Sequence, residues 1–479
     1  MSDFDFPNLM LAAPEIVLLS AASLVLVWDV YRGAAVRLST YRLAQASLIV
    51  TLVAVLLVYP SEPSRTFSDT FVLDQMGAVL KVMTLLVGFF CFFYARDYLI
   101  ARDEGKGEFY ILGLFSILGM LVLISAHNLL TVYLGLELLS LSLYALVALN
   151  RNSAASSEAA MKYFVLGALA SGMLLYGISM LYGATASLDL AVIQLAVAKG
   201  GSTDLILALG LVFVLVGIAF KLGAAPFHMW IPDVYEGAQT PVTMFVGTVP
   251  KLAAFAMLIR VLVDGLHGLH GDWADMLVIL AILSMAVGNI VAIAQANLKR
   301  MFAYSTIAHM GFLFLGVIPG TVEGFAASMF YVIVYSVMSL GAFAMIIVLS
   351  RAGFEADRLE DFKGLTHRSP WCAFLVMVLM LSMAGVPPFL GFWAKWAVLQ
   401  EVIAAGYVWL AVVAVLLSVI GLFYYLRIVK LVYFDEADDD TAIEAAGDVK
   451  VMVSANSLAI LVVGLFPGAL LGLCLSSLG

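Results

Sequence analysis

Charged residues are scarce in this sequence. Asp, Glu, Lys and Arg make up 12% of its 479 residues and hydrophobic residues 63%, whereas about 25% of an ordinary soluble domain is charged. This scarcity excludes an ordinary soluble domain and predicts that lipid is the main solvent of the chain. Basic residues form no patch of the kind that binds nucleic acid, so we expect no nucleic-acid partner. The net charge of -9 carries no fold signal, because much of the acid lies in Asp435–Asp448, which we interpret as a solvated loop.

Cysteine is also scarce. The three cysteines, Cys91, Cys372 and Cys474, lie far apart inside apolar runs, with neither C-x-x-C spacing nor a histidine at metal-ligand distance. Iron-sulfur clusters need clustered thiolates, and no glycine-rich dinucleotide motif follows a strand. We therefore expect no metal and no cofactor in this chain, and we interpret the cysteines as small core residues.

The N-terminus lacks the basic segment of a cleavable signal peptide. Met1–Asn8 holds two acidic residues and no Lys or Arg, and the apolar run that follows it is long enough to cross a membrane. We expect that run to be the first transmembrane helix.

Long apolar runs fill most of the sequence. A helix needs about 20 apolar residues to cross ~30 Å of hydrocarbon. We predict an all-α integral membrane protein with about 14 transmembrane helices in a single membrane domain, residues 1–479. The predicted spans are 9–29, 40–59, 71–95, 109–126, 127–149, 159–183, 204–223, 241–263, 273–294, 301–318, 323–349, 371–400, 407–434 and 452–475.

The basic residues are distributed unequally between the two sides that these spans define. Lys and Arg accumulate in the cytoplasmic connections of membrane proteins. Of the 24 in this chain, sixteen lie in one set of connections and three, Arg65, Lys199 and Arg260, in the other. Both termini are then expected to face away from the cytoplasm. The sixteen are Arg32, Arg37, Arg42, Arg96, Arg102, Lys106, Arg151, Lys299, Arg300, Arg351, Arg358, Lys363, Arg368, Arg427, Lys430 and Lys450.

Five lysines fall inside the predicted spans. A charge near the bilayer centre costs at least ~2.5 kcal/mol on insertion scales, so each one needs a partner, water or a function. Lys251 lies ten residues into its segment, and so does Glu137, which puts both about 15 Å deep and near mid-membrane. The five lysines are Lys81, Lys162, Lys221, Lys251 and Lys395.

Two of these lysines lie beside predicted helix breaks. Lys221 precedes Pro226 in the tract 205–242, which is far too long for one continuous helix across the bilayer. Lys395 follows the glycines and prolines that interrupt the stretch 370–401. Backbone groups freed at such depth are tolerated only where they line a polar cavity. Paired interruptions of this kind indicate an internal repeat of transporter type.

Lysine chemistry suits these positions. A lysine removed from water has a lowered pKa and can lose its proton, and a nearby carboxylate raises that pKa again. We therefore hypothesise that Glu137 and Lys221 form a pair whose opening and closing release and recapture protons. His228 and His309 are candidates to relay protons through water, and a structural role for each of them stays open.

Structural interpretations apply to other polar residues of the spans. Lys81 is expected to snorkel or to pair with Asp74, and a direct role in proton transfer is the alternative. Lys162 lies four residues after Glu158, the spacing of an ordinary helix ion pair, so this role competes with a proton-transfer role. The histidines that we expect to be structural are His127, at the edge of a span, and His267 and His270, in a loop.

Four motifs resemble one family. His228–Thr243, with the sequence HMWIPDVYEGAQTPVT, closely resembles the antiporter-like membrane subunits of respiratory complex I, the proton-translocating NADH-quinone oxidoreductase. Supporting matches are Glu158–Phe164 (EAAMKYF), Asn297–Gly311 (NLKRMFAYSTIAHMG) and Gly385–Phe392 (GVPPFLGF), and the resemblance extends from about Asp74 to Val432.

The resemblance implies a fold and a set of site residues. It implies two inverted five-helix repeats, each with a broken helix, which we assign to 109–263 and 273–434, flanked by helices in 9–95 and 452–475. Lysine at position 395 and a chain without a long C-terminal lateral helix favour one branch of the family over its siblings. The residues that match the family's functional positions are Glu137 (essential glutamate), Lys162 (sixth-helix lysine), Lys221 (broken-helix lysine), Lys251 (central lysine) and Lys395 (distal lysine).

The resemblance also implies a function. The chain is expected to move protons, driven by quinone reduction in other subunits, with NADH, FMN, iron-sulfur clusters and quinone all bound outside this chain. Its expected partners are the other membrane and peripheral subunits of complex I, the lipid bilayer and internal water. The expected location is the bacterial inner membrane, with both termini on the periplasmic side.

Three alternatives stay open. A subunit of a multisubunit sodium/proton antiporter shares the repeat, and co-purification with flavin and iron-sulfur subunits would decide against it. A metabolite carrier needs a substrate pocket at mid-membrane. The third alternative is a passive structural scaffold.

Overall fold

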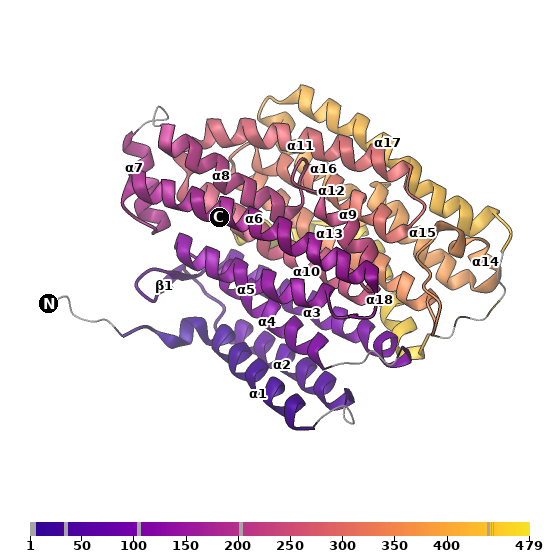
Figure 1. Cartoon of the computed structure of the whole chain (residues 1–479). Coiled ribbons are helices and arrows are strands. Elements are labelled where there is room, and N and C mark those ends of the chain that lie inside the picture. Colours follow the sequence, from indigo (N-terminus) through magenta and orange to yellow (C-terminus); the bar gives the residue numbers. More distant parts are fainter. Residues whose placement is uncertain are drawn as a thin grey trace.

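The protein is a bundle of long helices that run between two ends of the molecule (Figure 1). The computed structural model describes residues 6–32, 37–102, 107–200, 205–437, 441, 443 and 445–479. The hairpin β1–β2 and helix α7 mark one end, which we name the terminus end, because Asn8 contacts Thr66 there and Gly479 lines a cavity with Asp74. Helix α14 marks the opposite end, the far end. Lys106 and part of the predicted loop Asp435–Asp448 lie outside the described residues.

The first three long helices form a layer with a small hairpin at the terminus end. They are α1 (Ala13–Arg32, preceded by the 3-10 turn Leu9–Ala12), α2 (Arg37–Leu57) and α3 (Gln75–Ala101). Strands β1 (Ser64–Thr66) and β2 (Phe71–Leu73) pair antiparallel between α2 and α3. The predicted span 71–95 therefore begins later than expected, because Phe71–Leu73 is a strand and the Asp74 side chain caps α3.

The next two groups of helices each contain one that is broken. The first group is α4 (Glu108–Ile124), α5 (Leu129–Val147), α6 (Ala154–Thr185), α7 (Leu190–Gly200), α8 (Leu205–Leu222), α9 (Trp230–Gly237) and α10 (Thr240–Ile259), followed by a π-helical turn, Arg260–Gly265, and a 3-10 turn, His267–Leu269. The second group is α11 (His270–Ile293), α12 (Leu298–Val317), α13 (Val322–Leu349), the 3-10 turn Leu359–Phe362, α14 (Leu365–Arg368), α15 (Pro370–Ala384), α16 (Leu390–Ala404) and α17 (Val408–Phe434). Helices α18 (Gly447–Leu465) and α19 (Gly468–Ser476) end the chain.

The two groups share a close helix crossing. In the first, Gly119 of α4 and Gly135 of α5 bring the backbones together, so that a Cβ on Gly135 would lie 2.8 Å from the Leu123 nitrogen. In the second, Gly288 of α11 approaches α12, and a Cβ there would lie 2.6 Å from the Ala308 nitrogen. Such small-residue crossings are a common means of packing membrane helices. The recurrence agrees with the predicted pair of repeats.

Most of the predicted spans coincide with helices. Among the described residues, eleven helices are long and apolar enough to cross a membrane, and they match eleven of the fourteen predicted spans. The other three, 109–126, 301–318 and 371–400, fall on α4, on α12 and on the pair α15–α16. The all-helical membrane fold is confirmed, and the count of fourteen stays a prediction.

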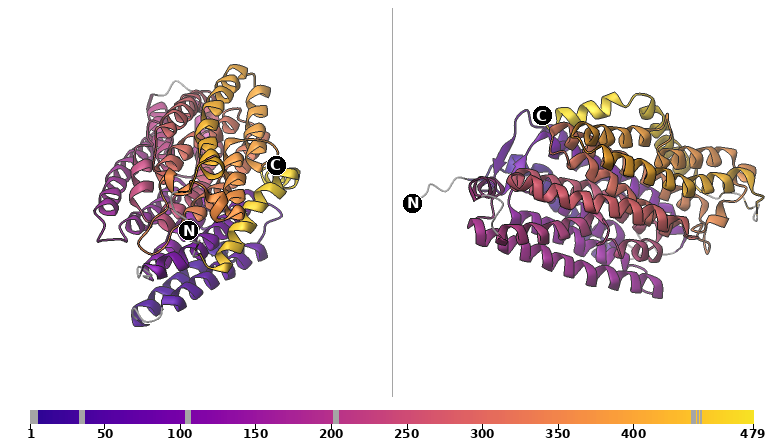
Figure 2. Two further views of the ribbon diagram at one scale, coloured as in Figure 1. Left: turned by 90° about the vertical axis from the view of Figure 1, so that its right-hand side faces the viewer. Right: turned by 90° about the horizontal axis from the view of Figure 1, so that it is seen from above.

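The bundle has a buried centre and an apolar exterior. Every residue of α10 is buried, and nearly all of α13 is. Helices α1 and α2 lie at the outside in the left view of Figure 2. Together with α6 and α17, they expose large hydrophobic side chains such as Leu24, Leu57, Leu169 and Leu416. Exposed apolar faces and a buried polar centre are the pattern of a protein that has lipid as its solvent.

Candidate functional site

Both broken helices end at a glycine in the left-handed region. Gly223 follows α8 with φ +83°, and Gly385 follows α15 with φ +85°. The N–H of the residue after each glycine donates to the carbonyl of Ala219 (2.8 Å) or of Leu381 (3.0 Å), as in a Schellman cap. The turn leaves the last carbonyl groups of each half-helix free to accept hydrogen bonds from side chains.

A lysine occupies each of these helix ends. Lys251 Nζ lies 2.8 Å from the carbonyl oxygen of Leu222 and 3.3 Å from the carbonyl before it. Lys395 Nζ lies 2.9 Å from the carbonyl oxygen of Ala384 and 2.9 Å from Ser418 Oγ. A helix C-terminus carries a partial negative charge, so each end stabilises an ammonium group. The prediction that each break has a lysine beside it is confirmed, but in the first repeat the lysine bound to the carbonyls is Lys251.

Lys221 points to a different partner from the one predicted. Its Nζ lies 2.9 Å from Ser140 Oγ on α5, one turn beyond Glu137. Glu137 and Lys221 form no ion pair within 4 Å in this structure, so the predicted opening and closing of the pair stays a prediction. The Glu137 side chain is half-buried, and its Oε1 is buried without a hydrogen-bond partner among the described residues. Lys221 is therefore bound to Ser140 and not to Glu137 in this structure.

His309 lies in a cluster of hydroxyl groups. Its Nδ1 is 2.7 Å from Tyr331 Oη, and its Nε2 is 3.2 Å from Tyr425 Oη. Tyr425 Oη is in turn 2.5 Å from Ser305 Oγ. All four side chains are buried. The position of His309 agrees with the predicted relay. The tyrosines were not predicted, although hydroxyl groups inside apolar spans were a signal that could have found them.

Further hydroxyl groups connect this cluster to α10. Thr306 Oγ1 lies 2.8 Å from Tyr335 Oη, which donates to the carbonyl of Gly247 at 3.0 Å. Gly247 is one turn before Lys251 on α10. Polar groups therefore extend from the first broken helix, across α10, α12 and α13, towards Lys395 on the second.

His228 lies outside this line of groups. It lies in the turn between α8 and α9 and is half-buried. The next residue, Met229, is 71% exposed. Its Nδ1 is buried and has no hydrogen-bond partner within the part of the chain that the structure describes. His228 forms no hydrogen bond with the residues of the His309 cluster in this structure.

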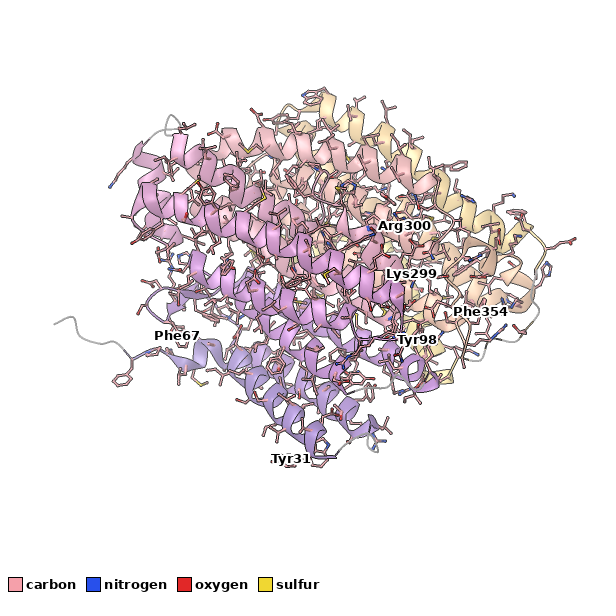
Figure 3. The ribbon with its side chains drawn as sticks, viewed as in Figure 1. Tyr31, Phe67, Tyr98, Lys299, Arg300 and Phe354 are labelled. Carbon is pink, nitrogen blue, oxygen red and sulfur yellow. The ribbon has the colours of Figure 1, made fainter. Side chains whose placement is uncertain are left out.

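Lys162 belongs to a network of ion pairs near the far end. Its Nζ lies 2.8 Å from both Glu158 and Asp233, and its side chain is 44% exposed. Asp233 also pairs with Arg300 at 2.7 Å, and Arg300 is labelled in Figure 3 beside Lys299. The ordinary ion pair with Glu158, one of the two interpretations of Lys162, is present. Lys162 is not among the buried lysines.

Two other charges have partners that differ from those predicted. Lys81 Nζ lies 2.6 Å from Glu15 Oε1 on α1, rather than pairing with Asp74. Asp74 instead pairs with Arg260 at 2.6 Å. Arg260 was assigned to a connection, but it is buried at the end of α10. Glu15 was missed, although an acidic residue inside the first apolar run was a signal for it.

The remaining predictions concern cysteines, histidines and metals. All three cysteines are free and buried, as small core residues are. His270 starts α11 and bonds the Ile318 carbonyl at 3.0 Å, so it is not a loop residue as predicted. Within the described ranges no group of three or more His, Cys, Asp or Glu could hold a metal ion. The expectation that this chain carries no cofactor stays a prediction.

Known proteins share this architecture. A chain of respiratory complex I from Thermus thermophilus with bound aureothin superposes with a TM-score of 0.82 at 33% identity, covering 96% of this chain and 98% of that one. A chain of the Mrp complex from Dietzia sp. has a TM-score of 0.81 at 22% identity over 98% of this chain and 96% of that one, a likeness of fold alone.

Sequence relatives cover nearly the whole chain. The family model described as NADH:quinone oxidoreductase/Mrp antiporter matches residues 126–421. NADH-quinone oxidoreductase subunit N of Thiobacillus denitrificans is 55% identical over 98% of this chain and 97% of its own length, and that of Thioalkalivibrio sulfidiphilus is 53% identical over 98% of both. The same subunit of Nitrosomonas europaea is 52% identical over 99% of both. The match of the family model and the identities above 50% over almost the full length show that the chain belongs to the family of NADH-quinone oxidoreductase subunit N, the antiporter-like membrane subunit of respiratory complex I.

Proposed function

We propose that this chain translocates protons as a subunit of NADH-quinone oxidoreductase, along a buried line of Glu137, Lys221, Lys251, His309 and Lys395. The observation that carries the proposal is the matched position of Lys251 and Lys395 on the carbonyl ends of two broken helices, with hydroxyl groups between them. Charges at this depth are costly, so a merely structural explanation for so many of them is weak.

The groups on this line are suited to proton transfer. A lysine can lose and regain a proton, whereas a carbonyl oxygen holds its ammonium without competing for the proton. His309 contacts a tyrosine hydroxyl on each side of its ring, so it can accept a proton from one side and return it to the other. Lys162 and His228 lie at the periphery of this line, and we propose that they act at its edge.

Glu137 marks the side on which a neighbouring subunit is expected. It lies on a face of α5 that exposes Leu130, Leu134 and Leu141, each more than half exposed. A carboxylate in such a face needs a partner that excludes lipid. We infer that another complex I subunit covers this face and that a change there alters the distance from Glu137 to Lys221. This is the route by which quinone reduction elsewhere would drive the chain.

The remaining elements of the proposal follow from the family. NADH, FMN, iron-sulfur clusters and quinone are bound by other subunits, and this chain is a multi-pass protein of the bacterial inner membrane. The bias of sixteen basic residues to three favours the terminus end as the periplasmic side. The alternative is that the chain is a subunit of a sodium/proton antiporter. The identities of 52–55% to oxidoreductase subunits favour the role in NADH-quinone oxidoreductase.

The experiment compares Lys251→Met with Lys430→Met in the purified complex, reconstituted in vesicles. Lys430 is an exposed lysine paired with Asp435 and serves as the control. At equal amounts of assembled complex, Lys251→Met is expected to lower proton transport by at least about tenfold, because a proton-transfer group is lost. NADH oxidation should fall with it. Parental transport in Lys251→Met would contradict the proposal.

A further inference from the structure

A second group of buried charges lies apart from the line between Lys221 and Lys395. Lys81 Nζ is 2.6 Å from Glu15 Oε1, and their side chains are 0% and 8% exposed. Arg260 pairs with Asp74 at 2.6 Å and with Asp264 at 3.1 Å. Two buried or nearly buried ion-pair groups on α1, α3 and the end of α10 have no part in the proposed line of lysines.

Two cavities at the terminus end open onto the second of these groups, the one around Arg260. They have volumes of about 340 and 570 Å³, and both are lined by Asp74, Arg260 and Asp264. We name the two together the vestibule. Since one water occupies about 30 Å³ of the liquid, the vestibule has room for on the order of ten waters or more. The polar lining makes it suitable for water.

His127 adds a titratable group to the vestibule wall. It lines the larger cavity, and both of its ring nitrogens are buried without a hydrogen-bond partner among the residues that the structure describes. It lies in the connection before α5, outside the spanning helices. Burial lowers the pKa of its imidazole, and the nearby charge of Arg65 acts in the same direction. His127 is therefore neutral at neutral pH.

Contacts between α3 and α10 define how these two antiparallel helices are aligned. Near the middle of the bundle, Cys91 Sγ lies 3.6 Å from Thr248 Oγ1. At the terminus end, Arg260 Nη2 lies 2.7 Å from Asp74 Oδ1. The two contacts lie at opposite ends of the same stretch of α3. The positions of α3 and α10 residues along the bundle axis can therefore be compared between these two contacts.

Polar side chains of α3 fill the distance between the vestibule and the central lysine. By this alignment Thr84 lies within about one turn of the level of Lys251. Its Oγ1 is buried and makes no hydrogen bond to the described residues. Lys81 is one turn nearer the vestibule, and Asp74, which caps the same helix and lines both cavities, lies two turns before Lys81. A series of polar groups thus leads from mid-membrane to the terminus end.

We propose that this series is a proton-release branch of the subunit, with Lys81 as its proton carrier and the vestibule as its exit. The proposal rests on the proposed function. The Lys81 ammonium gives its proton to the Asp264 carboxylate through vestibule water, and Asp264 passes it to the bulk. The neutral Lys81 amine then takes a proton that has left Lys251, which restores the starting state. Glu15 keeps its negative charge throughout and acts as a positioning residue, and Arg260 keeps its proton and holds Asp74 in place.

The competing explanation is an ion pair that only stabilises the fold, and a double variant separates the two. Each single change, Glu15→Gln or Lys81→Met, leaves a charge buried without its partner, but Glu15→Gln with Lys81→Met removes both. If the pair is only structural, the double variant regains parental assembly and parental proton transport. If the branch carries protons, the double variant assembles but transports protons at least several-fold more slowly at equal amounts of complex.

A matched control and a milder variant complete the experiment, which uses the complete complex in vesicles. The control is Arg96→Gln with Asp97→Asn, an ion pair on the same helix at the far end, in which Arg96 also contacts the exposed Asp448, and it should keep the parental rate. Asp264→Asn changes a side chain that is 31% exposed and does not alter Asp74 or Arg260. If the double variant does not assemble, this milder variant tests whether the branch carries protons. A lowered rate in Asp264→Asn supports the branch, and a parental rate overturns it. Lys251→Met separates the two proposals. If Lys251→Met abolishes transport but the double variant transports normally, only the proposed branch is wrong. If neither variant loses transport, the proposed function is wrong as well.

Discussion

The Lys395 ammonium lies 2.9 Å from the carbonyl oxygen of Ala384, at the end of the half-helix that precedes its own. Lys251 stands in the same relation to Leu222, at 2.8 Å. Carbonyl groups do not titrate in the physiological range. They therefore hold the charged form of each lysine but, unlike a carboxylate partner, do not take up its proton. Two lysines far apart in the sequence are therefore held by the same structural device, and both can be tested by substitution.

Lys395→Arg should assemble but transport protons poorly. Arginine keeps a cation at the helix end, but with a pKa above about 12 it practically cannot release its proton. We expect proton transport and NADH oxidation to fall together, and Lys395→His, which can titrate, to retain more of both. The measurement is NADH oxidation and proton uptake in vesicles at equal amounts of complex. An arginine variant that pumps like the parent would mean that Lys395 is a fixed charge.

Gly385→Ala should disturb the lysine, whereas Gly406→Ala should not. Both glycines have positive φ, +85° and +88°, so alanine costs about 1–2 kcal/mol of backbone strain at either site. A Cβ on Gly385 would lie 2.8 Å from Lys395 Cδ and 3.2 Å from its Nζ, whereas one on Gly406 would have no atom of the described residues within 4 Å. We expect a similar loss of thermal stability in both variants and a several-fold loss of proton transport only in Gly385→Ala. Equal transport in the two would refute the contact argument.

Ser140, rather than Glu137, should couple directly to Lys221. The hydrogen bond between Lys221 and Ser140 predicts a coupling of about 1 kcal/mol in a double-mutant cycle, roughly fivefold in rate. Glu137 makes no ion pair with Lys221 in this state, so the cycle of Glu137→Gln and Lys221→Met should give a smaller coupling. The cycles are measured as proton transport by the single and double variants. A larger coupling between Glu137 and Lys221 would indicate that these two side chains meet in another state of the transport reaction.

Lys162→Gln should have a small effect compared with Lys221→Met. Lys162 is 44% exposed, and its partner Asp233 keeps a second cation, Arg300, at 2.7 Å. Exposed ion pairs contribute little to stability, so we expect only a small loss of transport, less than about fivefold. Thermal unfolding and proton uptake of both variants check this. A loss as large as that of Lys221→Met would move Lys162 from the edge of the path into its centre.

Reporter fusions should separate the two ends of the bundle. A reporter after Arg102 or Arg358 is expected in the cytoplasm, and one after Lys199 outside it, because basic residues favour the cytoplasmic side. Helix α7, which carries Lys199, lies at the terminus end, and Arg358 precedes α14 at the far end (Figure 1). Detection of Lys199 and Arg358 on the same side would contradict both the topology and the fold.

The breaks and the mid-membrane lysines were predictable, but buried Glu15 and Arg260 and the partners of the charges were not. Gly385 and the prolines after it stop a helix wherever they occur, and a lysine inside an apolar run needs an explanation whatever surrounds it. The partner of Lys81, by contrast, is Glu15, which is 66 residues away, and not the nearby Asp74. Proximity in sequence favoured Asp74, and the packing of α1 and α3 brought Glu15 closer.

The sequence by itself determined the membrane helices, their two breaks, the residues that carry charge and the family. Helix length, apolar composition and the effects of glycine and proline are local properties, so they can be derived from neighbouring residues alone. The tertiary structure decided that Lys251 rather than Lys221 binds the end of α8, that Lys221 donates to Ser140, and that tyrosine hydroxyls contact both ring nitrogens of His309. The physical reason is that a side chain reaches only a few ångströms, so its partner depends on the alignment and rotation of helices that are distant in the sequence, and no local pattern specifies these.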